Sequence, residues 1–254
     1  MPVNYQKSED PQAARLSVEG RVAMVSGASR GIGLAIARQL LADGYRVSIG
    51  VRDVASTREV YSDVSNAHLL VAEFDACDPG SAAAWVGSTL DRFGRIHALV
   101  NNAGIWRKVG FDSGDEADLD ELWEVNAKAP FRLTRLVLPH LRACGTGRIV
   151  NIASTDGVRF RDLSCSVGYT MSKHALVALS HASRHAGYDD GVRVTALCPG
   201  AVATEMVAGL PGVTPLARQL PPATVAQVVA MLLALPNNAS VAWMPLNTRL
   251  ESTL

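Results

Sequence analysis

The stretch Arg21-Val-Ala-Met-Val-Ser-Gly-Ala-Ser-Arg-Gly-Ile-Gly33, with the run Leu34-Ala-Ile-Ala-Arg-Gln-Leu-Leu-Ala-Asp43 after it, decides the fold of this chain. The apolar residues after Arg21 predict a short buried strand, and the run from Leu34 predicts a helix that ends at Gly44. The loop between them is rich in glycine, which lets backbone N–H groups at the helix N-terminus approach a pyrophosphate. An ordinary tight turn is the alternative interpretation of this loop.

Further apolar runs alternate with helical segments along the rest of the chain. Strands are expected at residues 21–26, 46–51, 67–75, 96–100, 148–152, 192–198 and 240–244. This alternation predicts a doubly wound parallel sheet with helices on both faces, a three-layer α/β/α architecture. Irregularities are expected at Pro130 and Pro139 of a long helix over 118–142, and Thr224 is expected to cap the helix over 225–235.

The chain is expected to form a single domain over residues 19–254, preceded by a polar arm over residues 1–18. Within the domain, glycines and prolines interrupt residues 205–222 too often for a regular core element. Such a segment near a site is typical of a mobile lid over a substrate.

Polar and charged residues follow the predicted strands at the edge where a parallel sheet binds its ligands, the carboxyl ends. A site that prefers NAD places an acid at the end of the second strand, where this chain has Val51 followed by Arg52. Asp53 comes one residue too late for that role. Arg30, in the glycine loop, adds a second guanidinium suited to a 2′-phosphate. NADP(H) is therefore predicted in preference to NAD(H), with Asp75 placed to meet the adenine edge.

Tyr169 and Lys173 stand four residues apart on a predicted helix, and Ser154 follows the strand at 148–152. Side chains four apart share one face of a helix, so the phenol and the ammonium project the same way. A phenol titrates near pH ~10, and a nearby cation favours its ionised form. These residues are therefore candidates for a proton shuttle. Asn126, a polar residue in an apolar helical stretch, is interpreted either as a packed side chain satisfied by backbone groups or as part of this site.

Composition excludes several other classes of function. The 254 residues are 48% hydrophobic, and 24 basic residues balance 24 acidic ones, so no charge excess indicates a nucleic acid or a lipid surface as partner. No apolar run reaches membrane-spanning length, and the N-terminus lacks a secretory pattern. The four cysteines are widely separated, and no His/Cys cluster has zinc spacing. A cytoplasmic protein with free thiols and no metal is expected.

Taken in order, these motifs resemble those of the short-chain dehydrogenase/reductase family, over nearly the whole chain from about residue 19. The matching motifs are Ser26-Gly-Ala-Ser-Arg-Gly-Ile-Gly33, Asn101-Asn-Ala-Gly104, the tetrad Asn126, Ser154, Tyr169 and Lys173, and Pro199-Gly200 with Thr204. Ser26 replaces the usual Thr and keeps the hydroxyl. The resemblance implies a Rossmann fold, a homodimer or homotetramer, and hydride transfer between a nicotinamide cofactor and a small carbonyl or alcohol substrate.

The resemblance also implies a role for each tetrad residue. Tyr169 would be the general acid/base, and Ser154 would hold the substrate oxygen. Lys173 would bind the nicotinamide ribose and, with the cationic ring of the oxidised cofactor, lower the pKa of Tyr169. Asn126 would order a water next to Lys173. The residues implied in cofactor binding are Gly27, Ser29, Arg30, Gly31, Ile32, Gly33, Arg52, Asp75, Asn102, Ala103, Gly104, Tyr169, Lys173, Pro199, Gly200, Val202 and Thr204.

Two other functions compete with an oxidoreductase. One is a catalytically silent regulator that binds NADP(H) on the same fold, although such a protein is expected to have lost Tyr169 or Lys173. The other is an epimerase or dehydratase of nucleotide-linked sugars, whose members usually carry a larger carboxyl-terminal substrate domain.

The substrate itself is not predicted. Arg159 and Arg161 are interpreted as solvated loop residues or as anion ligands. Trp106, Phe160 and Met206 are interpreted as pocket or core residues.

Overall fold

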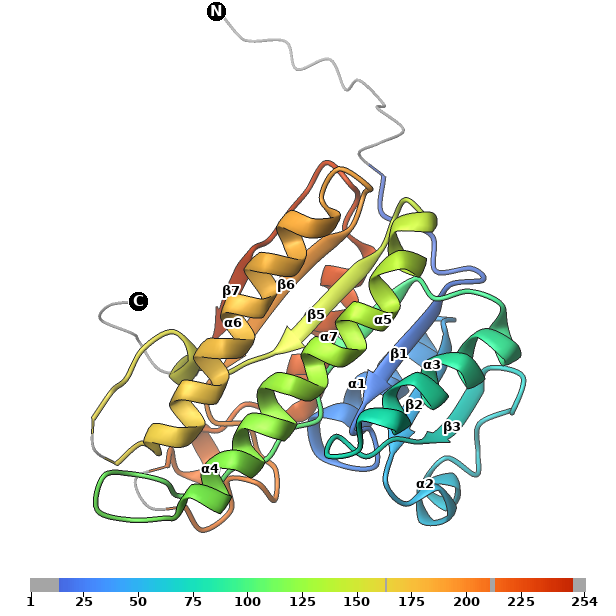
Figure 1. Cartoon of the computed structure of the whole chain (residues 1–254). Coiled ribbons are helices and arrows are strands. Elements are labelled where there is room, and N and C mark those ends of the chain that lie inside the picture. The colour runs from blue at the N-terminus through green and yellow to red at the C-terminus, as the bar shows by residue number, and fades with distance from the viewer. Residues whose placement is uncertain (1–13, 163, 211–212, 249–254) are drawn as a thin grey trace, which may run out of the picture.

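The computed structural model describes residues 14–162, 164–210 and 213–248, and in them one seven-stranded parallel sheet forms the centre of the molecule (Figure 1). The strand order is β3-β2-β1-β4-β5-β6-β7. The strands are β1 Val22–Ser26, β2 Arg46–Val51, β3 Leu69–Glu73, β4 Ala98–Asn101, β5 Arg148–Ile152, β6 Arg193–Pro199 and β7 Trp243–Leu246. The predicted doubly wound parallel sheet is therefore confirmed.

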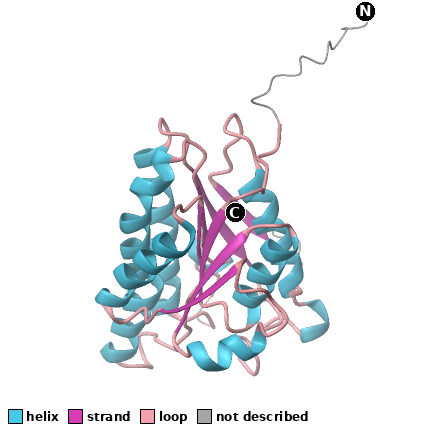
Figure 2. Ribbon diagram, turned by 90° about the vertical axis from the view of Figure 1, so that its right-hand side faces the viewer, coloured by secondary structure: helices cyan, strands magenta, loops and turns pink. Residues whose placement is uncertain are grey.

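Helices cover both faces of this sheet (Figure 2). They are α1 Gly31–Ala42, α2 Val54–Val60, α3 Pro79–Phe93, α4 Glu116–Trp123, α5 Ala129–Ala143, α6 Val167–Gly187 and α7 Pro222–Ala234. Helices α1 and α7 pack together on one face, and α3, α5 and α6 lie on the other. The apolar side chains of β1, β4 and β5 alternate between the two buried layers, so both faces of the sheet are core.

The direction of strand order reverses at β1, which pairs with β2 on one side and with β4 on the other. The connections that leave β1 and β4 therefore run to opposite faces of the sheet. This divergence opens a crevice at the carboxyl ends of the two strands. The glycine loop after β1 and the Asn101-Asn-Ala-Gly104 segment at the end of β4 both enter this crevice.

The long helix predicted over 118–142 is divided by a π-helical segment, η2, at Glu124–Lys128. Pro130 explains the position of this break, because it has no N–H to donate to the carbonyl of Asn126 one turn earlier. Pro130 lies instead in the first turn of α5. Pro139 lies inside α5 and does not end it. The irregularity expected at Pro130 is thus the π-helical segment η2, which lies in the turn before Pro130.

Three expectations near the carboxyl end need correction or completion. The last strand is Trp243–Leu246 rather than residues 240–244. Helix α7 begins at Pro222 after Pro221, and no side chain caps it, so the capping role expected for Thr224 is wrong. Between β6 and α7, η4 forms a short 3₁₀ turn at Leu216–Arg218, and Val202 bridges to Leu220. The lid predicted over 205–222 stays a prediction, and its residues 211–212 lie outside the described residues.

The predicted polar arm over residues 1–18 is described only from residue 14. Its last part contacts the domain, because the Leu16 N–H donates to the Ala234 carbonyl at the end of α7. Residues 1–13 lie outside the described residues.

A buried polar contact joins α3 to the sheet on the face opposite α1. The Trp85 indole N–H donates to Ser48 Oγ over 2.9 Å, and Ser48 Oγ lies 2.8 Å from Thr89 Oγ1. Ser48 and Thr89 are both 0% exposed. A side chain on Gly50 would lie 2.7 Å from the Trp85 ring, so the indole packs directly on the strand.

Replacing Ser48 with Ala should lower the free energy of unfolding by about 1–3 kcal/mol, because the buried Trp85 N–H loses its acceptor. Urea unfolding followed by circular dichroism measures this change. Ser88→Ala is the matched control, since Ser88 is exposed on the same helix, and it should change stability by no more than about 0.5 kcal/mol. Equal effects of the two substitutions would contradict the role assigned to the Ser48 hydroxyl.

Candidate active site

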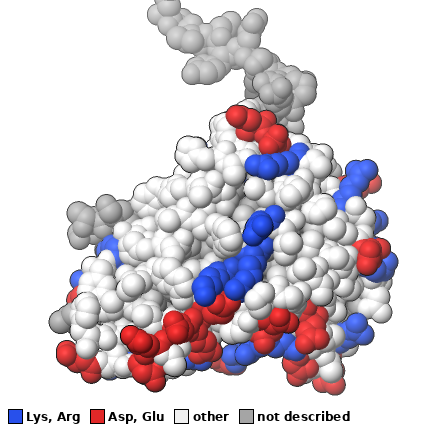
Figure 3. Space-filling view, in the orientation of Figure 1, with Lys and Arg blue, Asp and Glu red and all other residues white. Residues whose placement is uncertain are grey.

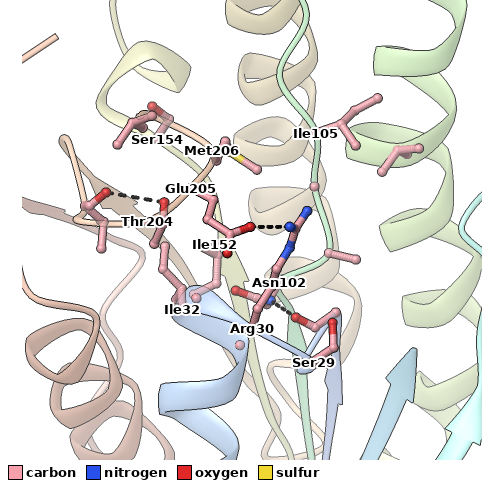
Figure 4. Close-up of a pocket in the computed structure, with 18 of the residues that line it drawn as sticks. Ser29, Arg30, Ile32, Asn102, Ile105, Ile152, Ser154, Thr204, Glu205 and Met206 are labelled. Carbon is pink, nitrogen blue, oxygen red and sulfur yellow. Dashed lines mark hydrogen bonds and ion pairs between the residues drawn. The ribbon is translucent and has the colours of Figure 1, made fainter. Parts of the chain in front are cut away.

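A cavity of about 660 Å³ lies over the carboxyl ends of the central strands. Every residue predicted to bind the cofactor lines it, and so do Ser154 and Met206 (Figure 4). Asn126 does not line it. The chain therefore brings its separate glycine-loop, strand-end and helix motifs to one enclosed space. Whether each residue binds a cofactor stays a prediction.

The glycine loop has the tight geometry that its sequence predicts. Gly27 has a φ of +67°, and a Cβ on it would lie 2.9 Å from the Cα of Ala103. A Cβ on Gly33 would lie 2.2 Å from the Gly27 carbonyl oxygen, too close for any side chain. The loop therefore needs glycine at these positions, and it aims the N-terminus of α1 at the cavity. The partial positive charge of that terminus suits a phosphate group.

Hydrogen bonds from the end of β4 hold the glycine loop in place. Asn102 Nδ2 donates to the carbonyls of Ser26 and Gly27 over 2.9 and 3.0 Å. In return, Ser26 Oγ accepts from the N–H groups of Asn102 and Ala103, each over 3.0 Å. Ser26 is 1% exposed, so these contacts lie inside the protein. The hydroxyl that Ser26 shares with Thr is the group that the arrangement uses.

At the end of β2, the cavity is lined by Val51 and Arg52 but not by Asp53. Val51 is buried, and Arg52 is exposed. The Asp53 carboxylate caps α2 by accepting from the Ser56 N–H over 3.0 Å. The Asp53 carboxylate is thus used to cap α2 and does not reach the cavity, as expected from its place one residue after Arg52. Asp75 lines the same end of the cavity, where its carboxylate accepts from the Cys77 N–H.

Arg30 lines the cavity, but its guanidinium forms an ion pair with the Glu205 carboxylate (Figure 4). Glu205 comes from the segment after β6, directly after Thr204, and also lines the cavity. Sequence reasoning missed Glu205. The only signal in the sequence was its place next to Thr204, which gives no indication of the contact with Arg30, 175 positions away.

Ser154, Tyr169 and Lys173 converge at the other part of the cavity. Ser154 follows β5, while Tyr169 and Lys173 lie one turn apart on α6. Ser166 caps α6 by accepting from the Tyr169 N–H, which fixes where this helix begins. Lys173 Nζ donates to the Ile152 carbonyl over 2.9 Å and lies 5.6 Å from the centroid of the Tyr169 ring. The predicted shared face of the helix is present.

The surroundings of Tyr169 and Lys173 destabilise the charged form of each, the phenolate and the ammonium. Burial raises the pKa of Tyr169, the Asp156 carboxylate raises this pKa further, and a hydrogen bond with Ser154 lowers it in part. Burial also lowers the pKa of Lys173 from 10.5 to about 8. The lowered pKa of Tyr169 was expected with the oxidised cofactor bound, and it stays a prediction. At neutral pH, Tyr169 is a protonated phenol.

Asn126 lies behind the cavity wall, in the π-helical segment η2. Its Oδ1 accepts from the Ile105 N–H, and its Nδ2 donates to the Ile105 carbonyl and to Ser172 Oγ. Ser172 Oγ in turn donates to the Tyr169 carbonyl. A Cβ on Gly104 would meet Asn126 Oδ1 at 3.2 Å and Lys173 Nζ at 3.4 Å, so all three approach closely. The Asn126 amide is thus satisfied by the Ile105 backbone and the Ser172 hydroxyl, and its part in the site stays a prediction.

The residues considered for a substrate pocket separate into two groups. Met206 lines the cavity and is 44% exposed. Trp106 and Phe160 do not line it, and neither do Arg159 and Arg161. Arg161 instead pairs with Asp162, its neighbour in the chain. Ile105, Val207 and Leu216 add apolar surface that the sequence analysis did not single out.

The fold and the cavity define a doubly wound α/β protein with a ligand site at its topological switch point. The model of the short chain dehydrogenase family matches residues 21–211, and the chain belongs to this family of oxidoreductases. Within the described ranges, no helix is both long and apolar enough to span a bilayer.

Named relatives support the same assignment. An agropine synthesis reductase from Rhizobium rhizogenes is 46% identical over 74% of this chain and 43% of its own length. This chain spans about half the length of the agropine synthesis reductases that it matches. Among solved structures, an alcohol dehydrogenase from Thermococcus sibiricus complexed with 5-hydroxy-NADP has a TM-score of 0.82 at 30% identity, covering 91% of this chain and 99% of that one. A 3-ketoacyl-(acyl-carrier-protein) reductase from Brucella melitensis complexed with NADH has a TM-score of 0.84 at 27% identity, covering 91% and 98%.

The lowered pKa of Lys173 predicts a specific pH dependence of stability. Between about pH 8 and 10.5 the unfolded chain holds a proton on Lys173 that the folded chain does not, so this residue makes folding more favourable as pH rises through the window. Below pH 8 both states are protonated, and this contribution is constant. Lys173→Met removes the contribution.

From pH 8 to 10, the free energy of unfolding of wild type should therefore increase relative to that of Lys173→Met. Urea unfolding at half-unit pH steps measures it. The exposed Lys108 gives the control, because Lys108→Met should follow the wild-type pH dependence. A difference that stays flat across the window for Lys173→Met would show that Lys173 is not destabilised as an ammonium.

Proposed function

We propose that this chain is an NADP(H)-dependent oxidoreductase that interconverts a ketone or aldehyde and the corresponding alcohol. The observation that carries the proposal is the convergence of Ser154, Tyr169 and Lys173 in the cavity that the glycine loop also lines. Relatives named as an alcohol dehydrogenase and a ketoacyl reductase support carbonyl and alcohol chemistry. The small-molecule substrate enters beside Met206, Val207 and Leu216.

The residues present fit a nicotinamide dinucleotide. The glycine loop and the N-terminus of α1 hold the pyrophosphate, because no side chain obstructs the backbone there. Lys173 would hold the nicotinamide ribose, and Val202 and Thr204, which line the same cavity, would contact the nicotinamide. When bound, the cofactor supplies hydride to the substrate carbon or takes it up from there.

Tyr169 moves the proton at the substrate oxygen. Its raised pKa keeps the phenol protonated at neutral pH, so it is ready to donate that proton to a carbonyl oxygen during reduction. The Ser154 hydroxyl donates a hydrogen bond to the same oxygen and stabilises the charge that develops on it. In the opposite direction, Tyr169 accepts the proton of the alcohol.

Asn126 acts on this site through the backbone rather than through its side chain. Its amide is engaged with Ile105 and Ser172, while Pro130 cannot donate to its carbonyl. That carbonyl is the group on η2 that would hold a water near Lys173. Such a water would let Lys173 exchange protons with solvent.

Two cations at the cavity support NADP(H) over NAD(H). Arg52 and Arg30 both line it, whereas the position for a ribose-binding acid holds Val51 and the nearby Asp53 caps α2. Arginine binds phosphate in a planar fork with charge-assisted hydrogen bonds.

The outer face of α4 and α5 supports association of copies as a homodimer or a homotetramer. Acidic side chains gather over α4 and basic ones over α5 (Figure 3). The acidic residues are Glu116, Asp118, Asp120, Glu121 and Glu124, and the basic ones are Lys128, Arg132, Arg135 and Arg142. Within the chain, Glu124 already pairs with Lys128 and Arg132, so a second copy packed antiparallel would meet charges of both signs on this face. Phe131 on α5 is 52% exposed and supplies apolar surface there.

Tyr169→Phe should lower kcat for NADPH-dependent reduction by about 10²–10⁴-fold, because the variant has no proton to donate. NADPH binding should remain. The measurement is NADPH oxidation against a panel of ketones, aldehydes and 3-oxo acids. Tyr188→Phe is the control, since Tyr188 is exposed just beyond the end of the same helix and away from the cavity. Retained turnover in Tyr169→Phe would remove its role, and wild-type binding of NADPH with no turnover on any substrate would favour the regulator.

Arg52→Gln should weaken NADPH binding by about 10- to 100-fold and leave NADH binding nearly unchanged, since a hydrogen bond to a charged group contributes about 1.5–3 kcal/mol. Titration of nicotinamide fluorescence measures both constants. Arg46→Gln removes an equally exposed arginine from the other end of β2 and should change neither. A similar loss for both cofactors would exclude Arg52 as a ligand of the 2′-phosphate.

A further inference from the structure

Glu205 links two walls of the cavity, the glycine loop and the segment that follows β6. Its carboxylate pairs with Arg30 in the glycine loop, while its own segment follows β6. The two segments also touch beside this pair, because a Cβ on Gly31 would lie 3.4 Å from Thr204 Cγ2. The ion pair therefore lies across the crevice in which the proposed cofactor would bind (Figure 4).

The Arg30–Glu205 ion pair contributes little to the stability of the fold, and a stronger anion can replace the carboxylate. The side chains of Arg30 and Glu205 are 72% and 74% exposed. Exposed ion pairs contribute little net stability, because water screens them and two long side chains must be ordered. A carboxylate with one negative charge is also a weaker partner for a guanidinium than a phosphate that carries up to two.

We propose that Glu205 is a specificity-determining residue that competes with the cofactor's 2′-phosphate for Arg30. The inference rests on the proposed function, in which Arg30 contacts that phosphate. NADP(H) must displace the Glu205 carboxylate to reach Arg30, so part of the interaction with the 2′-phosphate replaces an existing ion pair. NAD(H), which has no 2′-phosphate, leaves the ion pair intact. Glu205 therefore reduces the preference for NADP(H) that Arg30 and Arg52 create.

Displacement of Glu205 would also reach the substrate side of the cavity. Glu205 is followed directly by Met206, Val207 and Ala208, all of which line the cavity. Release of the ion pair frees the first residue of this segment. Binding of the 2′-phosphate is thereby connected to the wall against which the substrate rests.

Glu205→Gln tests the proposal by removing the charge at nearly constant shape. The Kd of NADPH should fall by about two- to fivefold, the range that corresponds to the measured strength of exposed ion pairs. The Kd of NADH should stay within about 1.5-fold of wild type. The gain should be smaller at 1 M salt, where the Debye length is about 3 Å. Asp91→Asn, an equal change of charge on α3 outside the cavity, should alter neither constant.

The same titrations in an Arg30→Gln background complete a double-mutant cycle. There Glu205→Gln should leave the ratio of NADPH to NADH affinity unchanged. Equal changes for both cofactors, weaker NADPH binding in Glu205→Gln, or an undiminished gain without Arg30 would each overturn the proposal. The ratio of NADPH to NADH affinity in the wild-type protein tests the proposed cofactor separately. If the wild type binds both cofactors equally, the proposed preference for NADP(H) is wrong. The effect of Glu205→Gln on this ratio still decides the role of Glu205.

Discussion

The hydrogen bonds between Asn102 and the carboxyl end of β1 are the constraint on which the cavity depends. They join β1 to β4 at the point where the strand order reverses, and they hold the Gly27 carbonyl against Gly33. Parallel sheets diverge at such a point, so an unsupported loop there would lose its shape. Because the contacts are partly buried and use both the side chain and the backbone of Asn102, they fix the glycine loop, the start of α1 and the entry to the Asn101–Gly104 segment together.

Local patterns were sufficient to predict most of this arrangement. The bounds of β2 and β5 follow from short apolar runs between polar ends, and α3 follows from Asp78 and Pro79 at its start. Since parallel strands end at the same edge of a sheet, the motifs after each strand had to meet, and the cavity contains them. The π-helical segment could be predicted only in part, because the sequence shows Pro130 but not how the preceding turn adapts to it.

Long-range packing decided what the sequence did not reveal. The contact of Arg30 with Glu205 depends on how the segment after β6 lies against the glycine loop, and neither residue signals it locally. The pKa of Tyr169 likewise depends on burial and on Asp156, which comes from a turn before α6. The last strand was misplaced for a similar reason, since pairing with β6 through Ala196–Trp243 sets its register. Apolar character alone does not determine register.

Burial at the candidate site shifts the pKa values of two groups in opposite directions, and it destabilises the charged form of each. It raises the pKa of Tyr169 and lowers that of Lys173 to about 8, so at neutral pH the phenol is neutral and the amine is still mostly protonated. The hydrogen bond to the Ile152 carbonyl orients this ammonium without neutralising it. A negative charge that develops on a substrate oxygen would therefore face a phenol ready to give up its proton and a nearby cation, whereas an alcohol would find no base already formed. The side chains thus place a protonated phenol and a cation beside the same part of the cavity, the arrangement on which the proposed role of Tyr169 rests.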